Sequence, residues 1–181
     1  MTRRGRDRTT LPDRDECVSI LRNCGCEDRV IAHCESVCRL AVKIARLCGA
    51  RIALVEAGAM LHDLGRCKTH SIHHAVEGAA IARDRGLPES LVNIIERHIG
   101  GGISEEEAAV LGLPPKSYLP ETLEEKVVAH ADNLIDGTRK VNIRTAVAEL
   151  TRRGLDRAAK RSSDLHEELS GIAGTDLDEL R

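Results

Sequence analysis

Hydrophobic residues recur along this chain at the three- and four-residue spacing of amphipathic α-helices. The spacing predicts a long helix over 26–49 and a second over 50–65, and each stretch ends in a glycine. Two further helical stretches, 73–86 and 87–102, also end in glycine. Glycine at such a position suits the left-handed conformation that closes many helices. The first half of the chain is therefore predicted to be helical almost throughout.

The second half continues the pattern with clear start and stop signals. Ser104 with Glu107, and Thr122 with Glu125, have the spacing of capping boxes at helix N-termini. Between them lies the proline-rich segment 112–120, which cannot be helical. Two more helical stretches, 142–153 and 155–170, follow Gly137. No part of the chain shows a convincing alternation of apolar and polar residues, which would indicate a β-strand.

The length of 181 residues suits one domain with a sizeable core. We predict an all-α fold, a helical bundle of seven to nine helices. Residues 1–12 are expected to form a flexible N-terminal tail. The main helical domain is expected over 13–140, and 141–181 should supply C-terminal packing helices of the same domain.

Composition narrows the range of partners. The net charge is −2 and aromatic residues make up 1% of the chain, so neither a basic field nor stacking side chains favour a nucleic-acid polymer. The chain has no apolar run of 18 residues and no apolar segment after its basic N-terminus. We therefore expect a cytoplasmic protein that does not bind membranes.

Seven cysteines favour a reducing compartment, because they lack the framework of a small secreted domain. Cys24, Cys26, Cys34 and Cys38 match no common zinc spacing well. The interpretation that these residues are buried free thiols is therefore preferred to a zinc knuckle.

Six ionisable residues interrupt the apolar faces of the predicted helices. In the long helix, His33 lies on the same stripe as Val37, Leu40 and Ile44. Each of four other predicted helices carries a similar exception. Singly, such residues are most often satisfied core groups, but six of them would carry a large desolvation cost. The residues are His33, His62 with Asp63, His74, His98 and Asp132.

Bound cations would remove that cost, because carboxylates neutralise metal charge and neutral imidazoles donate through nitrogen. Four histidines and two aspartates suit one metal ion in a nitrogen and oxygen site, or two ions that share a carboxylate. We therefore expect one or two divalent transition-metal ions, with Fe, Mn, Co, Ni and Zn all open.

These residues resemble a known family, the HD-domain metal-dependent phosphohydrolases, whose H…HD…D pattern is matched by His33, His62–Asp63 and Asp132. The resemblance covers roughly 15–140 and implies an all-helical HD-type metal-binding domain. It is strongest to small stand-alone archaeal HD proteins and to bacterial HD hydrolases of diadenosine polyphosphates. The segments HHAVEG and IIERHIGGG resemble the family branch with two metals, which implies His74 and His98 as ligands of a second metal.

The resemblance implies metal-dependent hydrolysis of a phosphoester or phosphoanhydride in a small nucleotide-like or cyclic-phosphate substrate. Asp63 is the expected bridging ligand and catalytic carboxylate. Arg66 is the second candidate catalytic residue. It stands in HDLGR where the family usually has lysine, so a lysine-specific proton transfer is in doubt. Arg66, Lys68 and Lys116 are candidate phosphate contacts, with ordinary solvated side chains as the alternative.

Two other functions stay open at this point. A few six-ligand relatives use iron to activate oxygen, which makes a di-iron oxygenase one alternative. The other is a non-catalytic HD binding module. The alternating charges of the last segment also fit a packing surface or a homodimer contact.

Overall fold

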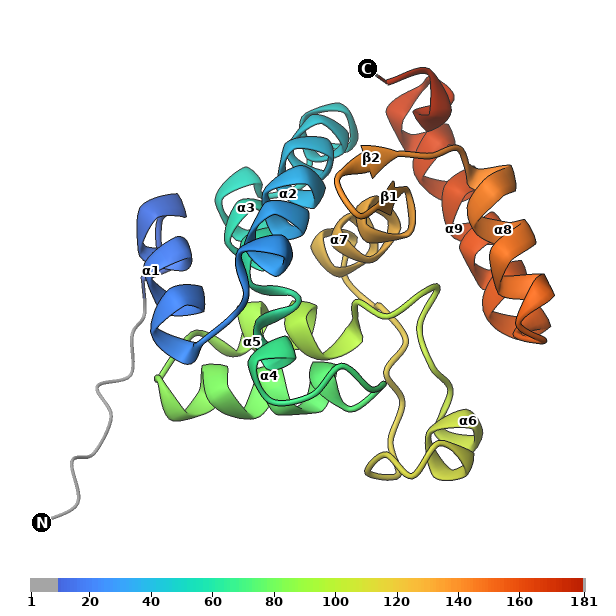
Figure 1. Ribbon diagram of the computed structural model, residues 1–181. Helices are drawn as coiled ribbons and strands as arrows, with labels where there is room; N and C mark the ends of the chain where they lie inside the picture. Colours follow the sequence, from blue (N-terminus) through green and yellow to red (C-terminus); the bar gives the residue numbers. More distant parts are fainter. Residues whose placement is uncertain (1–9, 181) are drawn as a thin grey trace, which may run out of the picture.

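The computed structural model describes residues 10–180, and Figure 1 shows its arrangement. The described residues form nine α-helices, two short 3-10 helices and one very short hairpin, so the predicted all-α fold is confirmed. The α-helices are α1 (Arg14–Cys24), α2 (Asp28–Cys48), α3 (Ile52–Leu61), α4 (His74–Asp84), α5 (Glu89–Arg97), α6 (Glu105–Val110), α7 (Leu123–Asn133), α8 (Ile143–Arg152) and α9 (Asp156–Ala173).

Helix α2 is the centre of the bundle. Its buried stripe packs against α3 and α7, and α9 packs along another part of it. The helix ends at Gly49, whose φ of 75° lies in the left-handed region that glycine adopts at little cost. The core is built from Ala, Val, Ile and Leu with buried cysteine thiols, because Tyr118 is the one aromatic residue of the chain. Small side chains allow these helices to pack closely.

The predicted helix starts are borne out by their hydrogen bonds. Ser104 and Glu107 form the complete capping box at α6, and the hydroxyl of Thr122 accepts the backbone N–H of Glu125 at α7. A further capping box joins Asp13 and Glu16 at the start of α1. Both predicted signals therefore mark real N-termini, and the Asp13–Glu16 box is a third that was not predicted.

One element departs from the sequence pattern. Strands β1 (Ile135–Asp136) and β2 (Arg139–Lys140) pair antiparallel, although the sequence shows no strand period. Two-residue strands are too short to produce a recognisable alternation. The turn between them contains Gly137, with φ of 62°, and follows directly on α7. This hairpin places the Gly137 carbonyl beside α2.

The two ends of the described chain pack against the bundle to different extents. Residues 1–9 of the predicted tail lie outside the described residues, but Pro12 is buried against the bundle. At the other end, α9 packs against α2 and α7, whereas α8 packs mainly against α9 and buries none of its own residues fully. Within residues 10–180, no helix is long and apolar enough to cross a membrane.

A close backbone contact joins the segment after α3 to α4. The 3-10 helix η1 (Leu64–Cys67) passes so near α4 that a Cβ on Gly65 would lie 2.5 Å from the nitrogen of Gly78 and closer still to the His74 carbonyl oxygen. A Cβ on Gly78 would lie 2.9 Å from the nitrogen of Gly65. Both glycines are thus required where two backbones touch.

We expect Gly65→Ala to lower the free energy of unfolding by at least about 2 kcal/mol, because neither backbone can yield without moving a whole helix. Gly171→Ala in α9 is a matched control, since its added Cβ meets no atom within 4 Å. That control should gain up to about 1 kcal/mol from helix propensity. Urea unfolding of the three proteins measures both effects, and equal stability of Gly65→Ala and wild type would contradict the close contact.

Candidate metal centre

The six ionisable residues meet in one buried cluster. They come from five parts of the chain: α2, the junction between α3 and η1, the start of α4, the end of α5, and α7. Four of the six are almost fully buried: His62, Asp63, His74 and His98. The bundle therefore brings together all the residues that the sequence pattern singles out, and their role as ligands is developed below as a proposal.

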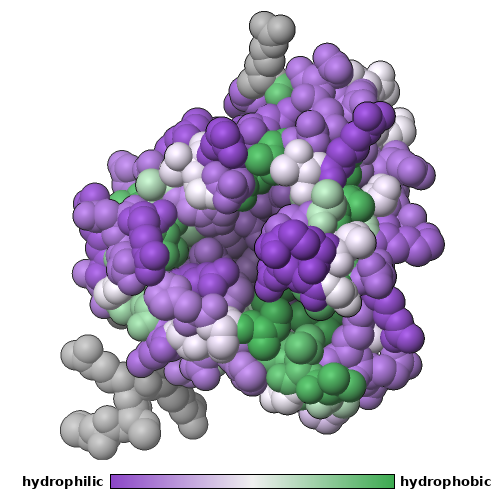
Figure 2. All heavy atoms as spheres, turned by 45° about the vertical axis from the view of Figure 1, so that its right-hand side comes forward, coloured by the Kyte–Doolittle hydropathy of each residue, from purple (hydrophilic) through white to green (hydrophobic). Residues whose placement is uncertain are grey.

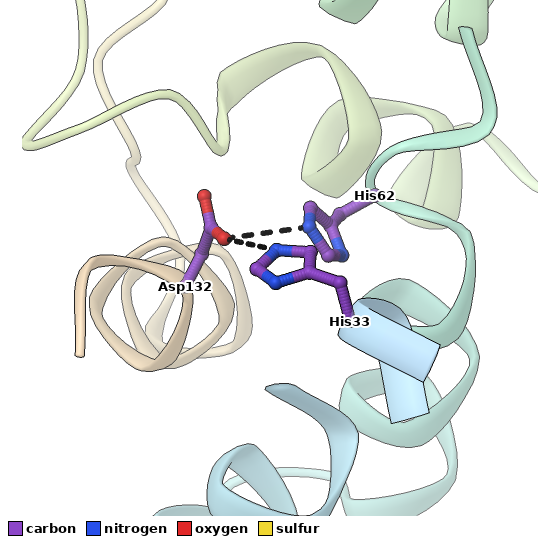
Figure 3. Close-up of side chains that lie close together, drawn as sticks. All are labelled: His33, His62 and Asp132. Atoms are coloured by element: carbon purple, nitrogen blue, oxygen red, sulfur yellow. Dashed lines mark hydrogen bonds and ion pairs between the residues drawn. The ribbon is translucent and has the colours of Figure 1, made fainter. Parts of the chain in front are cut away.

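One half of the cluster contains His33, His62 and Asp132 (Figure 3). The Oδ1 of Asp132 lies 2.9 Å from Nε2 of His33 and 3.5 Å from Nε2 of His62. Figure 3 shows the two rings and the carboxylate pointing toward one another from separate helices. Ligand atoms in this arrangement can surround one ion.

The other half is built around Asp63. Its Oδ1 lies 3.1 Å from Nε2 of His74 and 3.6 Å from Nε2 of His98. Its Oδ2 lies 3.8 Å from Nε2 of His62, on the side of the first group. The two oxygens of Asp63 therefore face different imidazoles, as a bridging carboxylate requires.

All four imidazoles are held in the same way. The Nδ1 atoms lie 2.7–2.8 Å from backbone carbonyl oxygens. Because a carbonyl only accepts, each Nδ1 must carry a proton and donate it. In the neutral ring the lone pair is then on Nε2, which is the arrangement typical of metal-ligating histidine. The pairs are His33 with Gly137, His62 with Ala59, His74 with Ser71, and His98 with Ile95.

These lone pairs face one another. The Nε2 atoms of His74 and His98 are 3.1 Å apart, and neither can donate while both rings are neutral with their proton on Nδ1. The Nε2 of His62 is buried without a hydrogen-bond partner among the described residues. Lone pairs and carboxylates packed this closely repel unless a cation lies among them. The residues present therefore fit divalent metal.

The pKa shifts point the same way. Burial raises the pKa of Asp63, but the imidazoles of His62, His74 and His98 outweigh it and hold the pKa well below its usual range. The pKa of Asp132 is lowered by His62 and His33 in the same way, against the effect of burial. Both carboxylates are therefore ionised at neutral pH. Burial opposes charge on His62, yet Cys34, Asp63 and Asp132 raise its pKa well above the usual value. Without a metal ion, a proton on Nε2 of His62 therefore takes the position that a cation would take.

A cavity of about 440 Å³ opens onto the cluster beside His33 and Asp63. Arg66 lines it and donates from Nε to Oδ1 of Asp63 at 3.0 Å and from Nη1 to the carbonyl of His70 at 3.0 Å. Arg66 thus holds the proposed bridging carboxylate while facing the opening. Arg29 also lines the opening, and the sequence analysis did not select it. The available signal was its position one helical turn before His33.

Two candidate phosphate contacts lie elsewhere. Lys68 is exposed and does not line the opening. The ammonium of Lys116 is 2.8 Å from the buried carboxylate of Glu96 and lies over the ring of Tyr118. Tyr118 is itself buried. Lys116 therefore forms an ion pair within the protein, because the buried carboxylate of Glu96 needs a positively charged partner.

A separate group of His166, Asp176 and Asp178 has metal-like spacing near the C-terminus. Its atoms already have partners: Nε2 of His166 is 3.1 Å from Asp176, and Asp178 accepts the backbone N–H of Ile143. These bonds attach the segment after α9 to the start of α8. The group is accounted for as a structural contact.

Comparison with known proteins identifies the family. The family model for the HD domain matches residues 30–135, so the chain belongs to the HD-domain family. A tRNA (cytidine(56)-2'-O)-methyltransferase of Thermoplasma volcanium is 46% identical over 98% of this chain. This chain spans about half the length of that relative, with 52% of it covered.

A small relative supports the predicted likeness to archaeal HD proteins. An uncharacterized protein of Methanocaldococcus jannaschii is 48% identical over 77% of this chain and 85% of its own length. Among solved structures, the HD domain of the L. monocytogenes phosphodiesterase PgpH covers 88% of this chain and 99% of that domain, with a TM-score of 0.53 and 18% identity. That likeness shows a common fold.

We expect metal to stabilise the protein, since the ligand atoms converge only in the folded state. Free Zn²⁺ or Mn²⁺ at roughly 100 times its Kd should add about 2.7 kcal/mol and raise the Tm by roughly 5–10 °C. His33→Gln should reduce this rise, whereas His73→Gln should leave it unchanged, because His73 is half-buried outside the cluster, where its Nε2 lies 3.3 Å from the carbonyl oxygen of Gly112. Calorimetry of the chelated and loaded proteins tests this. A rise of equal size in both variants would contradict the assignment of His33.

Proposed function

We propose that this chain is a two-metal phosphohydrolase that cleaves a phosphoester or phosphoanhydride in a small nucleotide-like or cyclic-phosphate substrate. The observation that carries the proposal is the convergence of four Nε2 lone pairs on two ionised carboxylates. Such a donor set suits borderline transition metals such as Fe, Mn, Co, Ni or Zn.

His33, His62 and Asp132 would hold one ion, His74 and His98 a second, and Asp63 would bridge them. When bound, the metal supplies Lewis acidity that polarises a phosphoryl oxygen and promotes ionisation of a water. The protein contributes orientation. Four carbonyl oxygens keep the rings aimed, and Arg66 keeps Asp63 turned toward both halves.

The opening of the cluster suits a phosphate group. Arg66 and Arg29 bring two guanidinium groups to a cavity that reaches Asp63 and His33. Guanidinium binds phosphate oxygens through paired charge-assisted hydrogen bonds. Arg29 already pairs with Glu27 at 2.7 Å on the exposed surface, where the pair is worth little, so a phosphate can compete for it. His70 lies at the same opening and could exchange a proton with a leaving group.

Membership in the HD-domain family supports this reaction class, and the common fold with a phosphodiesterase domain is in keeping with it. The PgpH domain has also been solved with cyclic-di-AMP. Fold alone does not determine a substrate. Methyl transfer is not proposed for this chain, since it spans only half of the methyltransferase it matches.

We expect the metal-loaded protein to hydrolyse p-nitrophenyl phosphodiesters, and Asp63→Asn to lose at least about 100-fold in kcat/KM. That loss exceeds the 10–100-fold typical of residues behind the ligands, because the amide cannot bridge two cations. Cys24→Ser is a control that should retain nearly full activity. Absence of turnover in wild type with verified metal, or oxygen consumption in place of hydrolysis, would reject the proposal and favour a binding module or a di-iron oxygenase respectively.

The metal count provides a separate prediction. His98→Ala should lower bound metal from about two ions per chain to about one, because His98 lies only in the Asp63 half. His73→Ala should keep two. Metal analysis after gel filtration measures the ratio, and two ions retained in His98→Ala would contradict the two-metal arrangement.

A further inference from the structure

A second, larger cavity of about 610 Å³ lies between α6 and the α8–α9 hairpin. Its lining is mainly apolar and includes side chains that are unusually exposed for their type. Val110 at the end of α6 is 87% exposed, and Leu155 between α8 and α9 is 40% exposed. Figure 2 shows hydrophobic atoms gathered on one part of this face, next to a hollow walled by hydrophilic atoms. We call the cavity of about 610 Å³ between α6 and the α8–α9 hairpin the hairpin groove.

Parts of the lining of the hairpin groove adjoin proposed metal ligands in the sequence. Ile99 and Gly100 in its lining directly follow His98, and Asn133 directly follows Asp132. The same segments are tied to α9: Arg161 donates to the carbonyl of Gly102 at 2.8 Å, and Asn133 donates to Ser162 at 3.4 Å. The groove therefore starts from the ends of the two helices that deliver proposed ligands.

The hairpin side of the groove is basic. Arg153 and Arg157 line it, are exposed, and form no ion pair within residues 10–180. Arg161 pairs with Glu107 at 2.8 Å, but its Nε is a buried donor without a partner among the described residues. Glu106, on the opposite wall, is engaged by the hydroxyl of Ser104. The groove thus combines an apolar floor with unpaired guanidinium groups.

We propose that the hairpin groove binds one nucleoside of a phosphodiester substrate whose scissile phosphate lies at the metal centre; this inference rests on the proposed function. A nucleobase offers a flat, largely apolar face, and the volume of the groove is within the range of small-ligand sites. Guanidinium planes stack on bases, which matters in a chain that has no Phe or Trp and whose one Tyr, Tyr118, is buried. The free guanidinium groups also match the anionic charge of a nucleotide.

Two model substrates separate the groove from the reaction. Thymidine 5'-(p-nitrophenyl phosphate) and methyl p-nitrophenyl phosphate release the same leaving group, but only the first carries a nucleoside. We expect the metal-loaded enzyme to hydrolyse both, with a KM at least about 10-fold lower for the nucleoside ester. Equal KM values would overturn the groove assignment and leave the proposed function intact.

Variants at the groove sharpen the test. Leu155→Asp and Arg157→Ala should each raise the KM for the nucleoside ester at least 5-fold, with kcat and the methyl ester unchanged within 2-fold. Ile172→Asp and Arg152→Ala are matched controls, because Ile172 is 48% exposed on α9 and Arg152 is exposed on α8, and neither lines the groove. All four replaced side chains are exposed, so the variants should fold, which circular dichroism checks.

Other outcomes would also decide the question. If neither ester is hydrolysed, the proposed function fails, and calorimetric binding of thymidine 5'-monophosphate to wild type and Arg157→Ala tests the groove by itself. If wild type binds the nucleotide and Arg157→Ala does not, the groove assignment is supported. If the two proteins bind it equally, the groove assignment is rejected. If gel filtration shows a wild-type dimer that Leu155→Asp converts to monomer, the groove is an interface between copies and the nucleoside assignment is wrong.

Discussion

Four hydrogen bonds from imidazole Nδ1 atoms to backbone carbonyls fix the histidine rings on which the proposed metal centre depends. They set the tautomer of His33, His62, His74 and His98 and aim every Nε2 at the two carboxylates. Three of these carbonyls belong to the same helix or turn as their histidine, but the fourth is that of Gly137, far along the chain. The small β1–β2 hairpin therefore has a role in the cluster, since it supplies the acceptor that orients His33.

Burying this cluster costs free energy, and a bound cation would offset that cost. Six polar residues from five segments meet only if the helices approach closely, and the Gly65–Gly78 contact is where that approach is tightest. Gly65 is two residues after Asp63, and Gly78 is four residues after His74. Stability and the proposed chemistry thus depend on the same packing. The α8–α9 hairpin is attached from outside, where it completes a groove without adding to the core around α2.

Periodicity predicted most of the helices and placed the six ionisable residues on their buried faces, because both depend on local spacing. Their shared desolvation cost and donor chemistry, and then the family resemblance, grouped them, and the structure brings all six together. Other features depend on contacts that spacing does not encode. Lys116 meets Glu96, and Lys140 meets three C-terminal carbonyls, through the fold alone. The strands at 135–140 are too short to leave a pattern. The choice of ring nitrogen depends on backbone carbonyls that carry no sequence signal.

The most direct measurement of the central claim is a long-range ¹H–¹⁵N correlation spectrum of the histidine rings, recorded with and without Zn²⁺. We expect a proton on Nδ1 of four rings in the zinc-loaded protein, and zinc should change the ¹⁵N chemical shift of Nε2 in all four. These rings belong to His33, His62, His74 and His98. The ring of His70, which is exposed, and that of His73, which is half-buried outside the cluster, should change little. Nε2 shifts that do not respond to zinc, or a proton on Nε2 in the loaded protein, would contradict the metal centre.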